Sequence, residues 1–457
     1  MSYDRRTLLK YMAGTSAAGL LAGCSSTDSN TTTQGGSGNG NVDTVTTLEF
    51  TTEEQDDSTP ADGETTTEGC DYQNVEPESS GGTVQLWHAR TEGGTNLLND
   101  TKSIFNNNFD HTLVLSQIPN SNFQAKLQSA IPSGEGPHIF QWAHDLAGSF
   151  DQSEFLSDQS GNIRVDPCTY SETAWSASQY GDKVIGLPWA AENVALIYNK
   201  NLVDEPPETL EDMKAIMEEY HDPDAGSFGL GYPINPYYVS GFAQAYGEEI
   251  YNGEEDSLGV TSDGVKQGLR VILNDLKPYM PRDPGGGTQK SIFVNGNAPF
   301  TIDGPWQLPN FEDTDFDVGV TTLPDLPNGG TPRPYMGVKL FYFATKMDEE
   351  QGNGTAAREF SEWYTTSRRR ILNLANNGGF VPVHSQLAND DRLPANVKGY
   401  AQQVSNGYPM PANPKMNQVW GPFGDAVTQA FNGNGNLDDL LATAEENIRN
   451  NWSDSGN

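Results

Sequence analysis

The sequence predicts an α/β fold with a parallel sheet at its core, and three observations support this class. From about residue 82 onward, strand and helix patterns follow one another in the order strand, helix, strand, helix, strand, which is typical of a parallel sheet. Hydrophobic residues make up 35% of the chain, so a substantial core can form. The 457 residues leave enough length for two sizeable domains.

The first five elements place a candidate site. Segment 83–89, "TVQLWHA", reads as a buried strand, and segment 97–109 has the apolar spacing of a helix. The elements that follow are a strand at 112–118, a helix at 122–131 and a strand at 136–143. Ligands of such sheets bind beyond the carboxyl ends of the strands. "WHA" (87–89) and "WAHD" (142–145) fall at that edge.

The second part of the chain continues the alternation without an internal repeat. A helix at 206–220 begins at Thr209, which is followed three residues later by Asp212, the spacing of a capping box. The other expected elements are helices at 267–280, 355–375, 423–431 and 437–452, a helix end running into a strand at 291–308, and strand and loop segments at 316–330 and 334–346.

The N-terminus predicts export and lipidation. Arg5 and Arg6 precede a short apolar run, and the run ends in Leu-Ala-Gly-Cys24. Paired arginines before such a run are typical of a twin-arginine export signal, and the four-residue box resembles a lipoprotein cleavage site. The run is too short for a good membrane span. We expect residues 1–24 to be the signal and Cys24 the lipidated residue; the alternative is a plain secretory signal.

Residues 25–81 are expected to form a disordered acidic Ser/Thr/Gly linker. Up to Ser80 this stretch contains no Lys or Arg and almost no large apolar residue, so burial cannot offset the entropy of ordering. A flexible coil of this length reaches about 40 Å. The folded part would then be held clear of a membrane to which Cys24 anchors it.

The charge of −36, from 62 acidic and 26 basic side chains, excludes several partners. Such a surface repels nucleic acid and anionic lipid headgroups. It is also the composition expected where high salt screens self-repulsion, which favours a halophilic protein over an ordinary acidic secreted one. Besides Cys24 the chain has Cys70 and Cys168, which could pair outside the cell. The absence of a CxxC motif argues against a zinc site.

Six segments in order carry a family resemblance. They are "IFQWAHDLAG", "GLPWAAENVALIYNK", "PETLEDM", "GNAPFTIDGPW", "VGVTTLPDLPNGGTPRPYMG" and "YPMPANPKMNQVWGPFGDAV". Together they resemble the extracellular solute-binding proteins of ABC transporters, most closely the maltose/maltodextrin-binding proteins, over about residues 83–454. The resemblance implies a periplasmic-binding-protein-like fold, in which a multi-crossover hinge joins two discontinuous α/β lobes around a ligand cleft.

The resemblance also implies where the lobes and the hinge lie. The expected segments are 82–190 and 341–388 for the first lobe, 194–335 and 392–454 for the second, and hinge crossovers near 190–193, 335–340 and 389–392. In this family the lobes close over the ligand by bending at the hinge.

The resemblance further implies a set of sugar-binding residues. A sugar presents apolar ring faces, which suit aromatic plates, and hydroxyl edges, which suit carboxylate acceptors. Matching positions predict stacking by Trp142, Tyr237, Trp306 and Trp420 and hydroxyl binding by Asp145 and Glu192. Taken by themselves these aromatics could equally be core residues, and the acids could be solvated surface groups.

Other positions depart from the family pattern. The family's Asp-Lys pair is Thr91-Glu92 here, so Arg90 and Glu92 are candidate replacements, and Asn235 stands where the family has a glutamate before Pro-Tyr. An arginine after the "WAHD" aspartate is replaced by Leu146. His144 and Asp145 point to opposite sides of an extended segment, so we expect His144 behind the cleft wall. The ligand could therefore be a maltodextrin or another oligosaccharide.

The sequence thus predicts a membrane-tethered, monomeric receptor on the extracellular face that delivers a sugar to the permease subunits of an ABC importer. No catalytic residue, metal or cofactor is expected. Two alternatives remain: a receptor for another solute class, and a secreted glycoside hydrolase, for which Asp145 and Glu192 would have to flank one glycosidic bond. An adhesion protein would be expected to show repeats, which are absent.

Overall fold

The computed structural model describes residues 70, 72–90, 92–311 and 314–454, except for the side chain of Glu92. The predicted signal, the lipidation residue Cys24 and the linker up to residue 69 lie outside the described residues. Residues 70–457 form one compact unit. Within the described part of the chain, none of the helices is both long enough and apolar enough to span a bilayer.

The first sheet has six strands and confirms the predicted α/β class. Strand β1 (Gly82–His88) lies between β2 (His111–Gln117) and β3 (Ile139–Ala143) and is parallel to both. The long strand β13 (Tyr335–Phe343) is antiparallel to β3 and to β6 (Gly186–Glu192). The carboxyl ends of β1 and β3 therefore meet at one edge, where "WHA" and "WAHD" stand, as expected.

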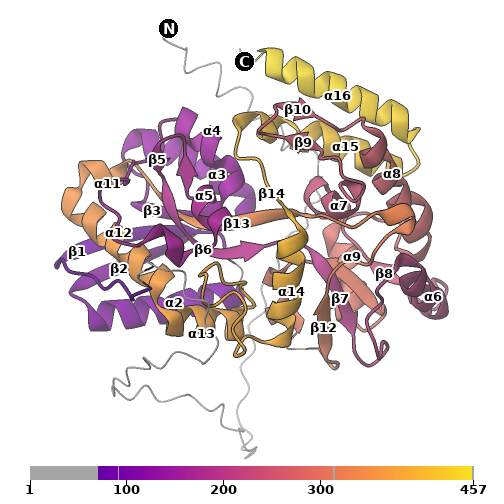
Figure 1. The fold of residues 1–457 in the computed structure, drawn as a ribbon, viewed down its shortest axis with the longest axis horizontal. Coiled ribbons are helices and arrows are strands. Elements are labelled where there is room, and N and C mark those ends of the chain that lie inside the picture. The colour runs from indigo at the N-terminus through magenta and orange to yellow at the C-terminus, as the bar shows by residue number, and fades with distance from the viewer. Residues whose placement is uncertain (1–69, 71, 91, 312–313, 455–457) are drawn as a thin grey trace, which may run out of the picture. The chain divides into compact units, whose positions relative to one another are not determined.

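Helices cover this sheet and complete what we call the first lobe (Figure 1). They are α2 (Glu92–Asn108), α3 (Asn120–Ala130), α12 (Gln351–Thr366) and α13 (Arg368–Gly378). Helix α2 packs on β2 and on α13, and α12 packs on β1 and β6. The core between them is strongly aromatic. The ring centroids of Phe105 and Phe360 are 5.0 Å apart, and those of Phe341 and Tyr364 are 4.8 Å apart.

The second sheet has four strands in the order β12, β7, β11 and β8. Their bounds are Val318–Thr321, Ala195–Asn199, Phe300–Asp303 and Leu230–Gly231. With its helices it forms what we call the second lobe, on the right in Figure 1. These helices are α6 (Leu210–Tyr220), α7 (Pro236–Ala243), α8 (Asp263–Val271), α9 (Gly286–Val294), α15 (Trp420–Phe431) and α16 (Leu437–Asp454).

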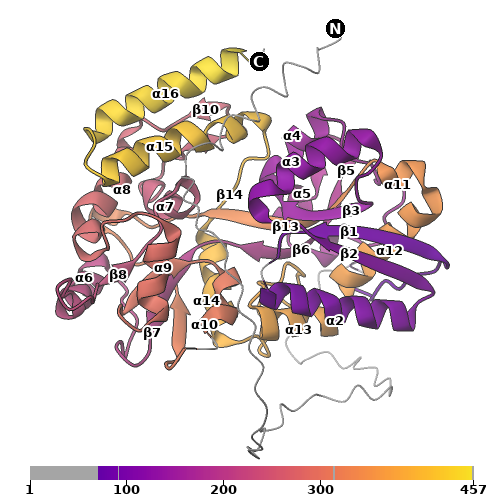
Figure 2. The same ribbon diagram turned by 180° about the vertical axis from the view of Figure 1, so that it is seen from behind.

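Two strands connect the lobes, as both views show (Figures 1 and 2). Strand β6 continues through Asn193 and Val194 into β7 of the second sheet. Strand β13 pairs with β14 (Tyr408–Pro409) through Tyr335 and Met336, and its later residues pair with β3 and β6. Helix α14 (Ala395–Asn406) packs on β12, β6 and β7. The lobe bounds and the hinge crossovers near 190–193, 335–340 and 389–392 stay a prediction.

The remaining elements are short. They are α4 (Ala147–Gln152), α5 (Glu172–Ala177), α10 (Leu308–Phe311), α11 (Lys346–Glu349), β4 (Gln179–Tyr180), β5 (Lys183–Val184), β9 (Tyr251–Asn252) and β10 (Ser257–Leu258).

Two predicted helices differ from the observed ones. The single helix expected over 355–375 is divided at Ser367, whose ψ of 99° ends α12 before α13 begins. The helix expected over 267–280 is α8, a π-turn at Ile272–Leu276 and a 3-10 turn at Lys277–Tyr279. Pro278 explains the second ending, because proline lacks an N–H and clashes with the preceding turn.

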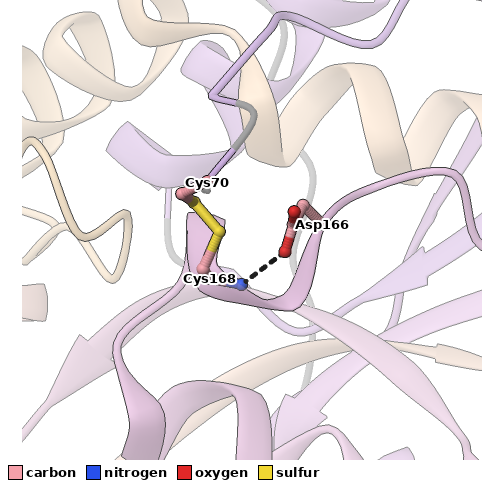
Figure 3. A group of neighbouring side chains, drawn as sticks. All are labelled: Cys70, Asp166 and Cys168. Carbon is pink, nitrogen blue, oxygen red and sulfur yellow. Dashed lines mark hydrogen bonds between the residues drawn. A yellow bond between two sulfur atoms is a disulfide. The ribbon is translucent and has the colours of Figure 1, made fainter. Parts of the chain in front are cut away.

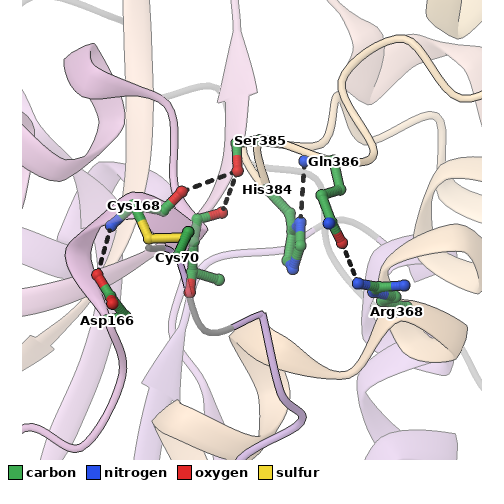
Figure 4. The surroundings of a disulfide bond; sticks show 8 residues. Cys70, Asp166, Cys168, Arg368, His384, Ser385 and Gln386 are labelled. Carbon is green, nitrogen blue, oxygen red and sulfur yellow. Dashed lines mark hydrogen bonds between the residues drawn. A yellow bond between two sulfur atoms is a disulfide. The ribbon is translucent and has the colours of Figure 1, made fainter. Parts of the chain in front are cut away.

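Among the described residues, contacts with the fold begin before the predicted start near Gly82. The Val75 N–H donates to Thr366 Oγ1 at 2.9 Å, and Ser79 Oγ donates to the Glu359 carboxylate at 2.5 Å. A disulfide joins Cys70 to Cys168, with 5.9 Å between the Cα atoms. Ser385 supports this point by donating to the Cys168 carbonyl at 2.8 Å (Figure 4). The composition of this stretch could not predict these contacts, because the hydrogen-bond acceptors belong to α12, far away in the sequence.

Candidate functional site

Two predicted carboxylates, Asp145 and Glu192, meet around a lysine. Asp145 lies in a 3-10 turn (His144–Leu146) directly after β3, and Glu192 ends β6. Lys339, in the middle of β13, extends its ammonium to 3.3 Å from Glu192 Oε1. The same ammonium acts on Asp145, because its charge lowers the pKa of that carboxyl group. The edge of the first sheet therefore holds two acids and one base.

Asp145 is the most perturbed member of this group. Burial raises its pKa to about 7; Lys339 opposes that rise, and the charge of Glu192 adds to it. The N–H groups of Asp145 and Leu146 donate to the carboxylate. Within the residues that the structure describes, Asp145 Oδ1 is buried and has no hydrogen-bond partner. A buried acceptor without a donor costs free energy, so this atom suits an incoming hydroxyl group.

Trp142 stands beside the carboxylates on β3. Its ring stacks on Phe123 with 5.0 Å between the ring centroids and an interplanar angle of 24°. The ammonium of Lys339 lies 6.0 Å from the ring centroid, within the range of a cation–π interaction. Trp142 is partly buried and packs against the hydrophobic cores of both lobes. It therefore lies where the lobes meet.

Tyr237 and Trp306 form an aromatic pair in the second lobe. Tyr237 lies in the first turn of α7, and Trp306 lies in a 3-10 turn, Pro305–Gln307, directly after β11. The ring centroids are 6.2 Å apart. The Tyr237 hydroxyl donates to the Glu192 carbonyl at 3.4 Å, and burial together with the charges of Glu192 and Asp145 raises its pKa well above the usual value. This aromatic pair thus borders the carboxylates of the first lobe.

The turn that carries Trp306 is held by a buried aspartate that the sequence analysis did not identify. Asp303 ends β11, is 1% exposed, and accepts from the Tyr238 hydroxyl at 2.5 Å and from the Gly304 N–H at 2.8 Å. Lys290 lies 3.3 Å from its second oxygen. A side chain at Gly304 would collide with the indole of Trp306, so glycine is required for the ring to fold back on this turn.

The structure places Trp420 apart from these contacts. It begins α15 and packs edge-on against Tyr335 of β13, with 5.5 Å between the ring centroids. Tyr335 belongs to the stretch of β13 that pairs with β14. Trp420 therefore lies against the strand shared by the lobes, from the side of the second lobe.

Three further residues were predicted to contact the ligand: Arg90, Glu92 and Asn235. Two of them make other contacts in the structure, and the side chain of the third is not described. Arg90 stacks over Trp189 at 4.2 Å and donates to Gln141 at 2.7 Å and to Tyr364 at 3.0 Å. The side chain of Asn235 caps α7 by accepting from the N–H groups of Tyr237 and Tyr238. Glu92 begins α2, but its side chain lies outside the described residues. Arg90 and Asn235 therefore position the elements that border the site.

His144 is buried and neutral, in the place expected for it behind the wall. It is 3% exposed, and burial lowers its pKa to about 4. The Val338 N–H of β13 donates to its Nδ1 at 3.1 Å, and it also bonds to the backbone of Met410. The ring thus links the end of β3 to β13 and to the chain after β14.

Lys339 carries a signal that the sequence analysis overlooked. It is the one charged residue of "YMGVKLFYF", a strand that is otherwise uncharged and mostly apolar. A charge in such a strand needs a partner or a cavity.

Among the described residues, one group of three potential metal ligands lies close together: Cys70, Asp166 and Cys168 (Figure 3). The disulfide occupies both sulfur atoms, and Asp166 accepts from the Cys168 N–H at 3.1 Å. These contacts explain the group without a metal ion.

Comparisons with known proteins point to one family. A family model described as bacterial extracellular solute-binding protein matches residues 102–402. The chain is 34% identical over 366 residues to a maltotriose-binding protein of Pyrococcus abyssi, and the match covers 78% of each chain. It is 25% identical over 329 residues to a maltooligosaccharide ABC transporter solute-binding lipoprotein of Streptococcus pneumoniae, with coverage of 67% of this chain and 74% of the relative.

The fold has a close counterpart among solved structures. A maltotriose-binding protein of Thermus thermophilus, solved with maltotriose bound, superposes with a TM-score of 0.72 at 24% identity. The match covers 81% of this chain and 100% of that one. At this level of identity the likeness supports the two-lobed fold alone.

Proposed function

Since the chain belongs to the bacterial extracellular solute-binding protein family, we propose that it is a receptor for a maltooligosaccharide-like sugar and delivers that sugar to an ABC import permease. One observation of the structure carries the proposal. Trp142, Asp145 and Glu192 of the first lobe meet Tyr237 of the second lobe, and Asp145 Oδ1 is buried without a partner among the described residues. Aromatic faces beside carboxylate acceptors match the two kinds of surface that a sugar presents.

Each residue has a distinct role in this proposal. The rings of Trp142, Tyr237, Trp306 and Trp420 receive sugar faces, and Asp145 and Glu192 accept hydrogen bonds from hydroxyl groups. Bending of β6, β13 and the 389–392 segment closes the lobes over the ligand. The site uses no metal or cofactor, and the protein acts as a monomer.

Binding is tested by calorimetric titration and thermal shift in molar KCl with maltose, maltotriose, maltotetraose, a galactooligosaccharide and glucose 6-phosphate. We expect a maltooligosaccharide to bind and, at a hundred times its dissociation constant, to stabilise the fold by about 2.7 kcal/mol. Binding of the galactooligosaccharide alone would move the proposal to another oligosaccharide. If none of the neutral sugars raises the melting temperature, the proposal is refuted.

The proposal excludes catalysis. A glycoside hydrolase needs two carboxyl groups on either side of the scissile bond, about 5 Å apart or 6.5–9.5 Å apart. The family match and the maltotriose-binding relative support binding of a sugar rather than cleavage of its glycosidic bonds. We expect no new reducing ends after prolonged incubation with maltotetraose; their appearance would favour the hydrolase.

We also propose that the protein is exported by the twin-arginine pathway and anchored outside the cell through lipidated Cys24. Arg5, Arg6 and the box that ends at Cys24 support this. In the Cys24→Ser variant, release into the medium or loss of processing is expected. Membrane and medium fractions are compared by immunoblot. Identical fractionation of the wild type and the variant would exclude the anchor.

The acidic composition supports a halophilic protein. With a net charge of −36, the compact state repels itself unless salt screens the charges. The melting temperature is therefore expected to rise steeply between 0.1 M and 3 M KCl. Calorimetric melts across this range check the expectation, with sucrose of matched water activity as the control for excluded-solute effects. A melting temperature independent of salt would contradict it.

A further inference from the structure

The residues opposite Lys339 on the two neighbouring strands leave room for its long side chain. It pairs with Ala143 of β3 and Ala190 of β6, and both of these neighbours have small side chains. Directly after Lys339, the pairing with β6 shifts by one residue, so that Trp189 is the extra residue on the partner strand. Such bulges occur next to functional sites, where they re-aim side chains.

The side chain of Lys339 touches or acts on three residues of the proposed sugar site. Its ammonium lies 3.3 Å from Glu192 Oε1 and 6.0 Å from the centroid of Trp142, and its charge acts on Asp145. The side chain is 28% exposed, so it is shielded but can still reach a bound molecule. These contacts join Trp142, Asp145 and Glu192 into one group.

A glycine beside Lys339 leaves room for its partner. A Cβ atom at Gly337 would lie 3.0 Å from Glu192 Cγ and 3.2 Å from Glu192 Oε1. Such distances are tighter than ordinary van der Waals contact. Because Gly337 has no side chain, Glu192 can lie over β13 and direct its carboxylate to the ammonium.

Lys339 is the cation that acts on Asp145. Glu192 raises the pKa of Asp145, since two neighbouring carboxylates repel each other. Tyr237 and Tyr342 also face Asp145, and their pKa values are raised well above the usual value, so both are neutral. His144 is neutral as well, because burial lowers its pKa to about 4. Among the described residues, Lys339 supplies the positive charge that opposes the repulsion between the two acids.

We propose that Lys339 is a positioning residue of the sugar site, whose ammonium favours the ionised form of Asp145 and holds the Glu192 carboxylate in place as a hydrogen-bond acceptor beside the face of Trp142. This inference rests on the proposed sugar-binding function. An ionised carboxylate only accepts, whereas a protonated one must donate through one oxygen. Because the site holds two acidic side chains and one basic side chain, it accepts neutral sugars and repels sugar phosphates or uronic acids.

The test begins with the ligand-free protein, so that it does not depend on the ligand. The carboxyl carbon of Asp145 is titrated by NMR in the wild type and in Lys339→Met. An opposite charge at this range lowers a carboxyl pKa by about 1–3 units, so the midpoint for Asp145 should rise by at least about one unit in the variant. Lys346→Met is the matched control. It removes the same charge from the residue three positions after β13, where Lys346 pairs with Glu350 at 3.8 Å; the Asp145 midpoint should not move.

The second readout is affinity for maltotriose as a function of pH. Lys339→Met should bind about ten- to a hundredfold more weakly at pH 7, and the pH at which affinity is half-maximal should move upward. Lys339→Arg should restore both the Asp145 midpoint and part of the affinity, because it keeps the charge. Lys339→Gln serves in place of Lys339→Met if the latter does not fold.

The outcomes separate the two proposals. An unchanged Asp145 midpoint in the charge-removing variant overturns the role of Lys339, whatever the affinity. A wild type that binds no neutral sugar overturns the proposed function, while the titration still decides whether Lys339 controls the carboxylate. A shifted midpoint with unchanged affinity and pH profile also refutes the positioning role.

Discussion

Asp145→Asn is expected to weaken sugar binding about ten- to a hundredfold, because a hydrogen bond to a charged acceptor contributes about 1.5–3 kcal/mol. The ligand-free variant should nevertheless be more stable than the wild type at pH 8. The folded-state pKa of Asp145 is raised to about 7, so its contribution to stability is lost as the pH rises from the unfolded-state value through 7. An asparagine has no proton to lose. Titration calorimetry and melts at pH 5 and pH 8 measure both effects.

His144→Asn is the matched control for this prediction. It changes the neighbouring residue, whose ring accepts from the Val338 N–H at 3.1 Å behind the wall. Leaving that buried donor unsatisfied should cost about 1–3 kcal/mol of stability, with little loss of affinity in the molecules that remain folded. Equal affinities for the wild type and Asp145→Asn would place the sugar site elsewhere.

Trp142→Ala is expected to reduce both sugar affinity and the stability of the fold. Stacking on an aromatic ring contributes about 1–3 kcal/mol by analogy with nucleic-acid bases, so binding should weaken. A residue that only lined the cleft could be replaced without loss of folding. However, the ring also stacks on Phe123 and packs against both cores, so this variant should lose stability as well.

Removing the disulfide is expected to cause the largest loss of stability. Cys70 and Cys168 are 98 residues apart, and closing a loop of that size stabilises a fold by about 4–5 kcal/mol in the chain-entropy model. The double variant Cys70→Ser/Cys168→Ser should therefore melt several degrees lower, and reduction of the wild type should have the same effect.

Sugar affinity should be unchanged in that double variant, since the contacts of Cys168 are with Asp166 and Ser385 rather than with the cleft carboxylates. The control is the same reducing agent added to the double variant, where it should do nothing. A double variant that melts with the wild type would show that the packing of residues 75–79 on α12 suffices without the covalent link.

The sequence predicted helices and strands well where interactions between nearby residues determine where they begin and end. The capping box at Thr209 and Asp212 is present at the start of α6, and β1, α3 and β3 lie within a few residues of their predicted positions. The break at Ser367 was missed because the apolar spacing continues across it. What distinguishes that point is tertiary: Thr365 bonds to Tyr170 at 2.6 Å, and Thr366 accepts from Val75.

The candidate site was predictable only in part. Family resemblance transfers residues at matching positions, so it pointed to Asp145, Glu192 and the aromatic rings. It could not point to Lys339, whose role depends on the strand register that places it beside Ala143 and Ala190. Arg90 was predicted as a ligand contact from its place beside the family's Asp-Lys pair, and its stacking on Trp189 could not be predicted because it exists only in the folded chain.

Strand β13 passes between the lobes and is paired with other strands along its whole length. Tyr335 and Met336 pair with β14, residues 337–342 pair with β6, and residues 339–343 pair with β3. The His144 ring accepts from the Val338 N–H as well. A twist of one lobe against the other therefore acts where the pairing of β13 changes from β14 to β6, between Met336 and Gly337. In amide deuterium exchange, this predicts slow uptake along β13, and the rate at Val338 reports how often its hydrogen bond to the His144 ring opens as the lobes turn.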